Sequence, residues 1–93
     1  MVFKIEITAK AILDIEQTVD YIAIDASPAI AAIWKEKLQA IICSLQELPA
    51  RFPVIQEATE AKFPYRIAYH YSHGVIFRID EEKRLVYNCA HLP

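Results

Sequence analysis

The sequence of 93 residues contains only one glycine and two cysteines, and these scarcities exclude several classes of protein. Cys43 and Cys89 each lie within an apolar pattern and lack the spacing of metal ligands, so we expect buried, reduced thiols, with no metal and no cofactor. No run of 18 apolar residues is present, which excludes a membrane-spanning helix. Because the N-terminus follows a strand pattern instead of that of a secretion signal, we expect a cytoplasmic protein.

The sequence also lacks a dense cluster of basic residues. Its net charge is −2 and its isoelectric point is about 5.9. Residues 1–50 carry a net charge of −3, and residues 51–93 carry +1. Proteins that bind nucleic acids usually present a basic patch to the phosphates, and here only a few arginines in the second half could do so. The charge pattern therefore disfavours a function built on phosphate contacts.

Apolar residues make up 55% of the chain, above the roughly 45–50% of an average globular protein. This content argues against disorder, and the length predicts one domain spanning residues 1–93 with a single modest core. A core of that size does not use all of the apolar surface. We therefore expect part of this surface to contact a partner protein.

Periodicity at the start of the chain predicts a strand followed by an amphipathic helix. Val2–Ile7 alternates between apolar and charged residues, as in a strand with one buried face. Thr8 can cap the helix that follows. Asp14 and Glu16 are expected to face water. The apolar stripe of this helix is Ile12, Ile15, Val19 and Ile22.

A second helix begins at Ser27-Pro28, because serine can cap a helix and proline fits its first turn. It is expected to run for about 20 residues and to stop at Pro49. Trp34 could anchor a partner, although its place in the apolar stripe favours core packing. The stripe is Trp34, Leu38, Ile41, Leu45 and Leu48. Two apolar helices with a short link predict an antiparallel hairpin.

The second half of the chain predicts three strands. Residues 51–64 have no clean period and form a connecting segment, with a short helical turn expected at Ile55–Ala61. Residues 65–71, 75–79 and 85–90 alternate as strands. Gly74 is expected to supply a positive φ in the turn between the first two of them. The predicted fold is α+β in the order β-α-α-β-β-β, with a helical hairpin packed on one face of a small antiparallel sheet.

Four segments carry a resemblance to a known family. Ala11–Ile22 is an acidic and aliphatic helix that ends in Tyr-Ile, and Ser44–Pro53 closes the second helix with a leucine-rich turn before a proline. Val75–Asp80 is an apolar strand with an arginine before an acidic turn, and His91 closes the last strand. In this order and spacing, nearly the whole chain resembles the RelE/ParE superfamily of small bacterial toxins.

The resemblance implies the toxin of a type II toxin–antitoxin system, of the plasmid stabilisation kind, which a cognate antitoxin neutralises. ParE-like members inhibit DNA gyrase, and the acidic isoelectric point and the lack of a basic cluster favour this branch. The alternative is a RelE-like endoribonuclease that cuts messenger RNA in the ribosome. A third alternative is a non-toxic member that only binds its antitoxin, which the short end after His91 keeps open.

RelE-like chemistry requires a base for the ribose 2′-hydroxyl, cations around the phosphate and an acid for the leaving oxygen. Under that alternative, the catalytic candidates are Arg66, Arg78, Tyr87 and His91. Strand alternation predicts Arg66 and Arg78 on the face away from the helices, and Tyr87 directed into the core. The arginines are equally typical of solvated cations, and His91 of a packing histidine.

Three tyrosines and two further histidines are candidate binding groups. Tyr65, Tyr69 and Tyr71 could stack on bases, but their spacing also fits a sheet face packed on helices. His70 and His73 flank a turn without a third ligand close in sequence, which disfavours a metal site there.

Overall fold

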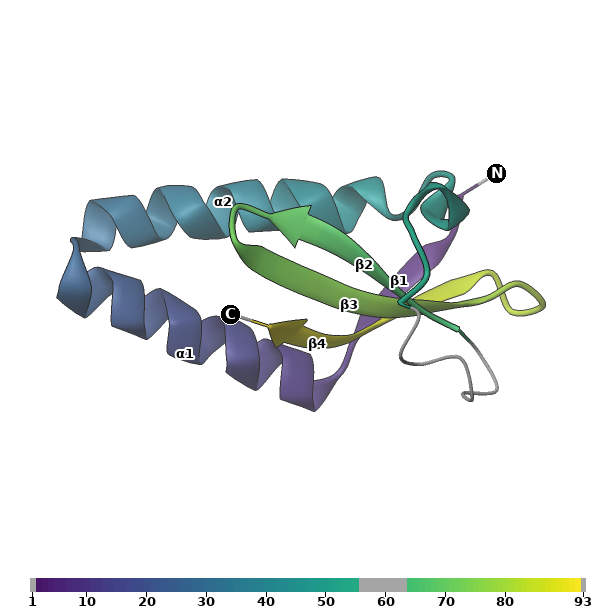
Figure 1. Cartoon of the computed structure of the whole chain (residues 1–93), viewed down its shortest axis with the longest axis horizontal. Coiled ribbons are helices and arrows are strands. Elements are labelled where there is room, and N and C mark those ends of the chain that lie inside the picture. The colour runs from purple at the N-terminus through teal and green to yellow at the C-terminus, as the bar shows by residue number, and fades with distance from the viewer. Residues whose placement is uncertain (1, 56–63, 93) are drawn as a thin grey trace.

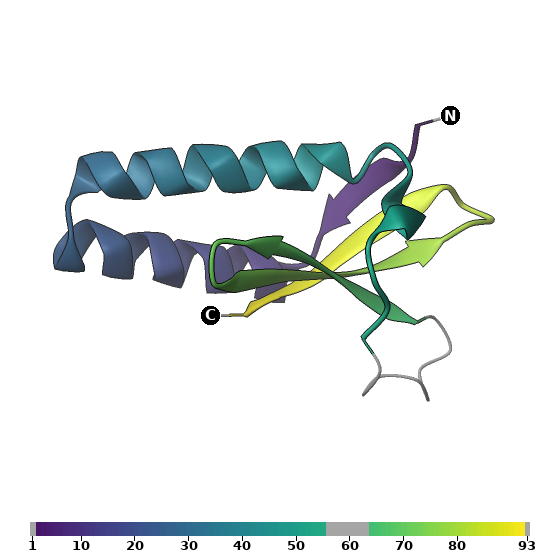
Figure 2. The same ribbon diagram turned by 45° about the horizontal axis from the view of Figure 1, so that its top comes forward.

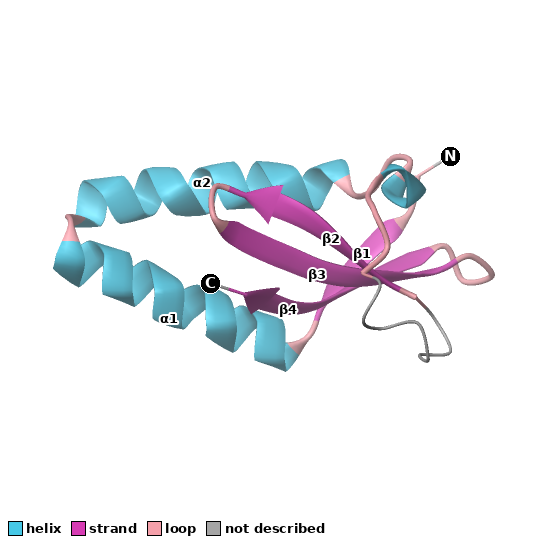
Figure 3. Ribbon diagram, viewed as in Figure 1, coloured by secondary structure: helices cyan, strands magenta, loops and turns pink. Residues whose placement is uncertain are grey.

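The order of elements in the structure matches the order predicted from the sequence. The computed structural model describes residues 2–55 and 64–92. Its elements are β1 (Lys4–Ile7), α1 (Ala9–Asp25), α2 (Pro28–Ser44), a short 3₁₀ helix η1 (Pro49–Arg51), β2 (Tyr65–His70), β3 (His73–Asp80) and β4 (Leu85–Leu92) (Figure 1). The two long helices and the strands form separate parts of an α+β fold (Figure 3).

The described part of the connection between α2 and β2 contains a short helix that the sequence pattern does not predict. The helical turn expected at Ile55–Ala61 lies outside the described residues, apart from Ile55 itself. The short helix η1 lies earlier in the chain, at Pro49–Arg51, where the sequence pattern predicts no turn of helix. Within residues 2–55 and 64–92, no helix has both the length and the apolar character that crossing a bilayer requires.

The four strands form one mixed sheet in the order β1-β4-β3-β2. The β2–β3 and β3–β4 pairs are antiparallel, whereas β1 pairs with β4 in parallel, with Ile5 opposite Val86. The prediction of a wholly antiparallel sheet is therefore wrong for β1, which lies beside β4 in Figure 2. The helical hairpin returns the chain to the end of the sheet where β1 began, so β2 runs in the same direction as β1. The chain then reverses twice, into β3 and into β4, and β4 is therefore parallel to β1 as well.

Both helices pack on the same face of the sheet, and their connecting end projects beyond the strands (Figures 1 and 2). Trp34 and Leu38 of α2 are buried, so core packing is confirmed for Trp34. In the predicted apolar stripe of α1, Ile15, Val19 and Ile22 are partly buried and pack against the core, whereas Ile12 is 45% exposed. The buried cluster consists of Phe3, Trp34, Leu38, Ile42, Leu45, Ala68, Val75, Phe77 and Val86.

The helix α2 ends at Ser44, earlier than the predicted stop at Pro49. The main-chain N–H groups of Leu45–Glu47 donate to carbonyls three residues earlier, so the chain tightens out of the α-helical pattern. Leu48, the residue before Pro49, then adopts a left-handed conformation with φ 47°, which turns the chain out of the helical path. The predicted apolar stripe is therefore wrong at Leu48, which is 75% exposed.

The turn between β2 and β3 obtains its positive φ from a tyrosine. The two-residue loop is Tyr71-Ser72, and Tyr71 has a φ of 56°. Gly74 lies within β3 and has no positive φ, so the predicted role of this glycine is wrong. Gly74 provides space instead, because a Cβ atom there would lie 2.6 Å from Cδ1 of Ile67.

Thr8 connects the start of α1 to β4. Its hydroxyl accepts a hydrogen bond from the Ala11 N–H (3.2 Å), which caps the helix as predicted. The same hydroxyl donates to the Cys89 carbonyl (3.0 Å), and the Thr8 N–H donates to the Asn88 carbonyl (3.0 Å). One residue therefore fixes both the first turn of α1 and the position of β4 beneath it.

We expect Thr8→Ala to lower the free energy of unfolding by about 2 kcal/mol, because it removes a helix cap and a bond to β4 together. Ser27→Ala, which removes only the cap that accepts the Ile30 N–H, should cost about 1 kcal/mol. Thr8→Ser keeps the hydroxyl and should stay close to wild type. Urea unfolding of the three variants measures these differences, and a larger loss for Ser27→Ala than for Thr8→Ala would contradict the double role of Thr8.

Candidate functional site

All three histidines of the chain converge on the indole of Trp34. Each of them comes from a different strand, while Trp34 comes from α2. The distances from the Trp34 ring centroid to those of His70, His73 and His91 are 5.0, 5.2 and 5.3 Å. The rings of His73 and His91 are stacked, with centroids 5.2 Å apart. The cluster lies between α2 and the helix-facing side of the sheet.

The register of the β2–β3 hairpin places two of these histidines. His70 and His73 are cross-strand partners on either side of the two-residue loop, so their side chains share the helix-facing side. His70 Nε2 donates to the main-chain carbonyl of Trp34 (3.0 Å), which joins this end of the hairpin to α2. The turn thus positions both imidazoles.

A β-bulge at Cys89 places the third histidine. Ala90 pairs with Ile76 and Asn88 pairs with Phe77, so Cys89 is an extra residue without a partner on β3. Without the bulge, strict alternation from the buried Asn88 would direct Ala90 inward and His91 toward the other face. Because of the bulge, His91 is buried beneath the helices at 3% exposure.

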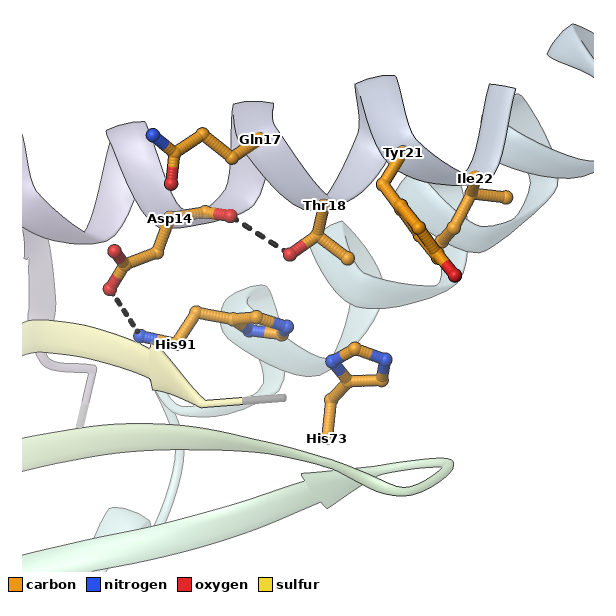
Figure 4. Close-up of a pocket in the computed structure, with 7 residues that line it drawn as sticks. All are labelled: Asp14, Gln17, Thr18, Tyr21, Ile22, His73 and His91. Atoms are coloured by element: carbon orange, nitrogen blue, oxygen red, sulfur yellow. Dashed lines mark hydrogen bonds between the residues drawn. The ribbon is translucent and has the colours of Figure 1, made fainter. Parts of the chain in front are cut away.

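A pocket of about 370 Å³ opens beside this cluster, between α1 and the sheet (Figure 4). His91 and His73 form its floor on the sheet side, and Tyr21 projects from α1 on the other side. The lining residues are Asp14, Gln17, Thr18, Tyr21, Ile22, His73 and His91. The pocket therefore combines polar groups from one helix with two imidazoles from the sheet.

Asp14 holds the end of β4 against α1. Its carboxylate accepts hydrogen bonds from the His91 main-chain N–H (3.2 Å) and from Lys10 Nζ (2.9 Å). The Lys10 hydrogen bond is the largest cause that lowers the pKa of Asp14 below its usual 3.8. Asp14 is therefore charged at neutral pH, and it contacts β4 although the sequence pattern placed it toward water.

His91 is uncharged at neutral pH. Burial, followed by the nearby His73 and His70, lowers the pKa of its imidazole to about 4. Burial also lowers the pKa of His70. Both nitrogens of His91 and Nδ1 of His73 are buried without a hydrogen-bond partner among the described residues. Buried polar atoms of this kind usually have a partner, so these nitrogens are available to a bound group.

Arg66 lies on the helix-facing side of β2, because it pairs with the buried Phe77. Its guanidinium donates to the carbonyls of Ala50 (3.1 Å) and Phe52 (2.6 Å), which fixes the segment around η1. The prediction that Arg66 faces away from the helices is therefore wrong. Ala68 on the same side is buried and pairs with the buried Val75, so the helix-facing side of β2 is its buried side.

Arg78 and Tyr87 lie on the opposite face of the sheet, as direct cross-strand partners. The Arg78 guanidinium stands 4.1 Å from the Tyr87 ring centroid, in the geometry of a cation–π contact. The face predicted for Arg78 is confirmed. Tyr87 does not point into the core, contrary to the prediction, because its neighbours Val86 and Asn88 take the buried side of β4.

The structure does not bring the four candidate catalytic residues together. Arg66 serves the η1 segment, Arg78 and Tyr87 share the outer face, and His91 lies beneath the helices. An acid–base reaction on one phosphate would need these groups to converge on the same atoms.

Within residues 2–55 and 64–92, no group of three or more histidine, cysteine, aspartate or glutamate side chains could hold a metal ion.

The histidine cluster was not predicted from the sequence. The sequence pattern places His70 and His73 beside a turn, and it gives His91 as the end of a strand and as a catalytic candidate under the RelE-like alternative, but it does not bring the three together. A two-residue loop between the first two would have indicated that they pair across the hairpin. The contribution of His91 depends on a bulge, for which the alternating pattern gives no signal.

Comparisons with known proteins agree with the fold. Residues 5–90 match the family model described as the ParE toxin of the type II toxin–antitoxin system parDE. A solved chain described as the chromosomal ParDE TA system from P. aeruginosa superposes with a TM-score of 0.78. The two chains share 14% identity over 98% of this chain and 95% of the other, which establishes a common fold. A comparison with curated proteins found no match.

The stability of the protein should fall in acid because His91 must be neutral in the fold. The folded pKa of about 4 lies below the ordinary 6.5, so the unfolded chain binds more protons between these values. This stabilisation is complete above pH 6.5 and is lost as the pH falls through 4. We expect a loss of about 3 kcal/mol from His91 in urea unfolding. His91→Gln should flatten the slope between these pH values, and an unchanged slope in that variant would contradict the assignment.

Proposed function

This chain belongs to the ParE toxin family of type II toxin–antitoxin systems, and from that membership we propose that it inhibits DNA gyrase and that a cognate antitoxin neutralises it. The inhibition is a binding event between proteins and needs no covalent chemistry on nucleic acid. The antitoxin covers apolar surface that the small core leaves exposed.

The observation that carries the choice of gyrase over messenger RNA is the separation of Arg66, Arg78, Tyr87 and His91 by the sheet. The most buried of them, His91, is neutral and 3% exposed, and it lies on the opposite side of the sheet from Arg78 and Tyr87, so these groups cannot act together on one phosphate. The net charge of −2 gives no general attraction to the ribosome. Both features favour protein binding over RNA cleavage.

The outer face of the sheet is the surface that we assign to the antitoxin. Two adjoining hollows of about 440 and 420 Å³ lie on it and share Ile55, Ile76 and Leu92. Tyr69, which is 68% exposed, lines the second hollow. Apolar side chains of an extended segment would fill these hollows and remove their lining from water.

The free part of the β2 edge lies beside these hollows. The start of the edge is covered, because Ile55 N–H donates to the Tyr65 carbonyl (2.8 Å) and Ile67 N–H donates to the Pro53 carbonyl (3.2 Å). Continuing this alternation directs the main-chain groups of Tyr69 to the same edge, where none of the described residues pairs with them. An antitoxin segment could therefore add a strand along Tyr69 while its side chains enter the hollows.

The gyrase proposal is tested with purified protein in a DNA supercoiling assay. We expect the protein to inhibit supercoiling by gyrase, and the product of the adjacent gene to restore it. Induced expression of the chain alone should arrest growth, and co-expression with that product should relieve the arrest. Unaffected gyrase together with codon-positioned cuts in primer extension would instead establish the ribosome-dependent nuclease. Antitoxin binding without any growth defect would establish the non-toxic alternative.

On the outer sheet face, Tyr69→Asp should weaken antitoxin binding by about tenfold or more, because it places a charge in an apolar contact. Ile24→Asp is the matched control, since Ile24 is 88% exposed at the projecting end of α1. Calorimetric titration with the adjacent gene product compares the two variants. Equal losses, or a loss for Ile24→Asp alone, would place the antitoxin on a different surface.

A further inference from the structure

The pocket between α1 and the histidine cluster has unused hydrogen-bonding capacity. His91 is 3% exposed and lines the pocket, yet neither of its ring nitrogens has a partner among the described residues. Nδ1 of His73 is also buried and has no hydrogen-bond partner among the described residues. The neutral imidazole of His91 presents one acceptor nitrogen, so the floor of the pocket offers an acceptor to a guest that can donate.

The charge around the pocket favours a cation. Asp14 contributes an ionised carboxylate to the lining at neutral pH, and His91 is neutral there. The helix that carries Asp14 has four carboxylates and a single lysine, which gives it a net charge of −3. That lysine, Lys10, pairs with Asp14 at the surface with its side chain 68% exposed. Exposed pairs of this kind contribute little, so a guest can displace Lys10 at small cost.

The shape of the pocket favours a flat cation over a compact one. Tyr21 is 66% exposed and lines one wall, so its ring can stack on a planar guest. The volume of about 370 Å³ exceeds that of a single long side chain. A guanidinium carries five donors in one plane and stacks on aromatic rings, which matches the acceptors of Asp14, Gln17 and His91.

We propose that this pocket receives an arginine side chain from a basic segment of a partner polypeptide, with Asp14 as its charged anchor and Tyr21 stacked on the guanidinium. The binding of an arginine side chain does not depend on the proposed function. Only the identity of the partner does, and under that function the partner is the antitoxin. An anionic guest is disfavoured by Asp14.

The test is an NMR titration of the full-length protein with N-acetyl-arginine amide. Its matched comparator is N-acetyl-citrulline amide, which has nearly the same shape and no charge. We expect the arginine probe to shift the resonances of Tyr21, His73 and His91 in a saturable manner, and the citrulline probe to bind at least about fivefold more weakly. Asp14→Asn should weaken the arginine probe by a similar factor, because the amide keeps an acceptor for the His91 N–H but loses the charge.

Asp20→Asn is the matched control, since it makes the same charge change on the exposed side of α1 outside the pocket, and it should leave the affinity within about twofold. Equal binding of both probes, equal effects of the two variants, or shifts confined to other residues would overturn the proposal. The comparison of probes on the wild-type protein does not depend on the folding of any variant. A failed titration leaves the supercoiling result untouched, and a failed supercoiling assay leaves the titration untouched, so the two failures are distinguishable.

Discussion

The bulge at Cys89, held by Thr8, determines which side chains of β4 face the helices. Thr8 donates to the carbonyls of Asn88 and Cys89 at the residues where β4 leaves strict alternation. Because the extra residue shifts the pattern, Asn88 and His91 both face inward, and His91 joins Trp34 beneath the helices. The Asp14 carboxylate then fixes the end of the strand through the His91 N–H. The histidine cluster and the pocket beside it follow from this one local feature.

The sheet consequently divides the polar residues of the molecule between two environments. On the helix-facing side, the imidazoles are buried and Arg66 is used to hold the η1 segment. On the outer side, Arg78 and Tyr87 form a cation–π pair near broad apolar hollows. Residues that a phosphate-cleaving enzyme would need on one surface are thus on two. A protein that acts by binding does not need these residues on one surface, because its affinity depends on a few well-packed contacts and on complementarity, and the division is therefore compatible with the proposed function.

Much of the fold could be predicted from the sequence, because helix periodicity, caps and turn residues are local signals. The start of α1 at Thr8 and the burial of Trp34 are examples. Features that depend on pairing could not be predicted in this way. The parallel β1–β4 contact follows from the path of the helical hairpin, and the buried side of β2 is set by Ala68 opposite Val75. The inward position of His91 depends on a bulge, which shifts alternation by one residue without a distinctive sequence.

The most direct test of the divided sheet is the NMR titration of the His91 imidazole itself. We expect it to titrate with a pKa of about 4 and to show contacts to the Trp34 indole, as a buried and neutral side chain would. A pKa near the ordinary 6.5 without contacts to Trp34 would contradict this. It would place His91 in solvent, where it could serve as an acid or base, and the argument for protein binding over RNA cleavage would lose its main support.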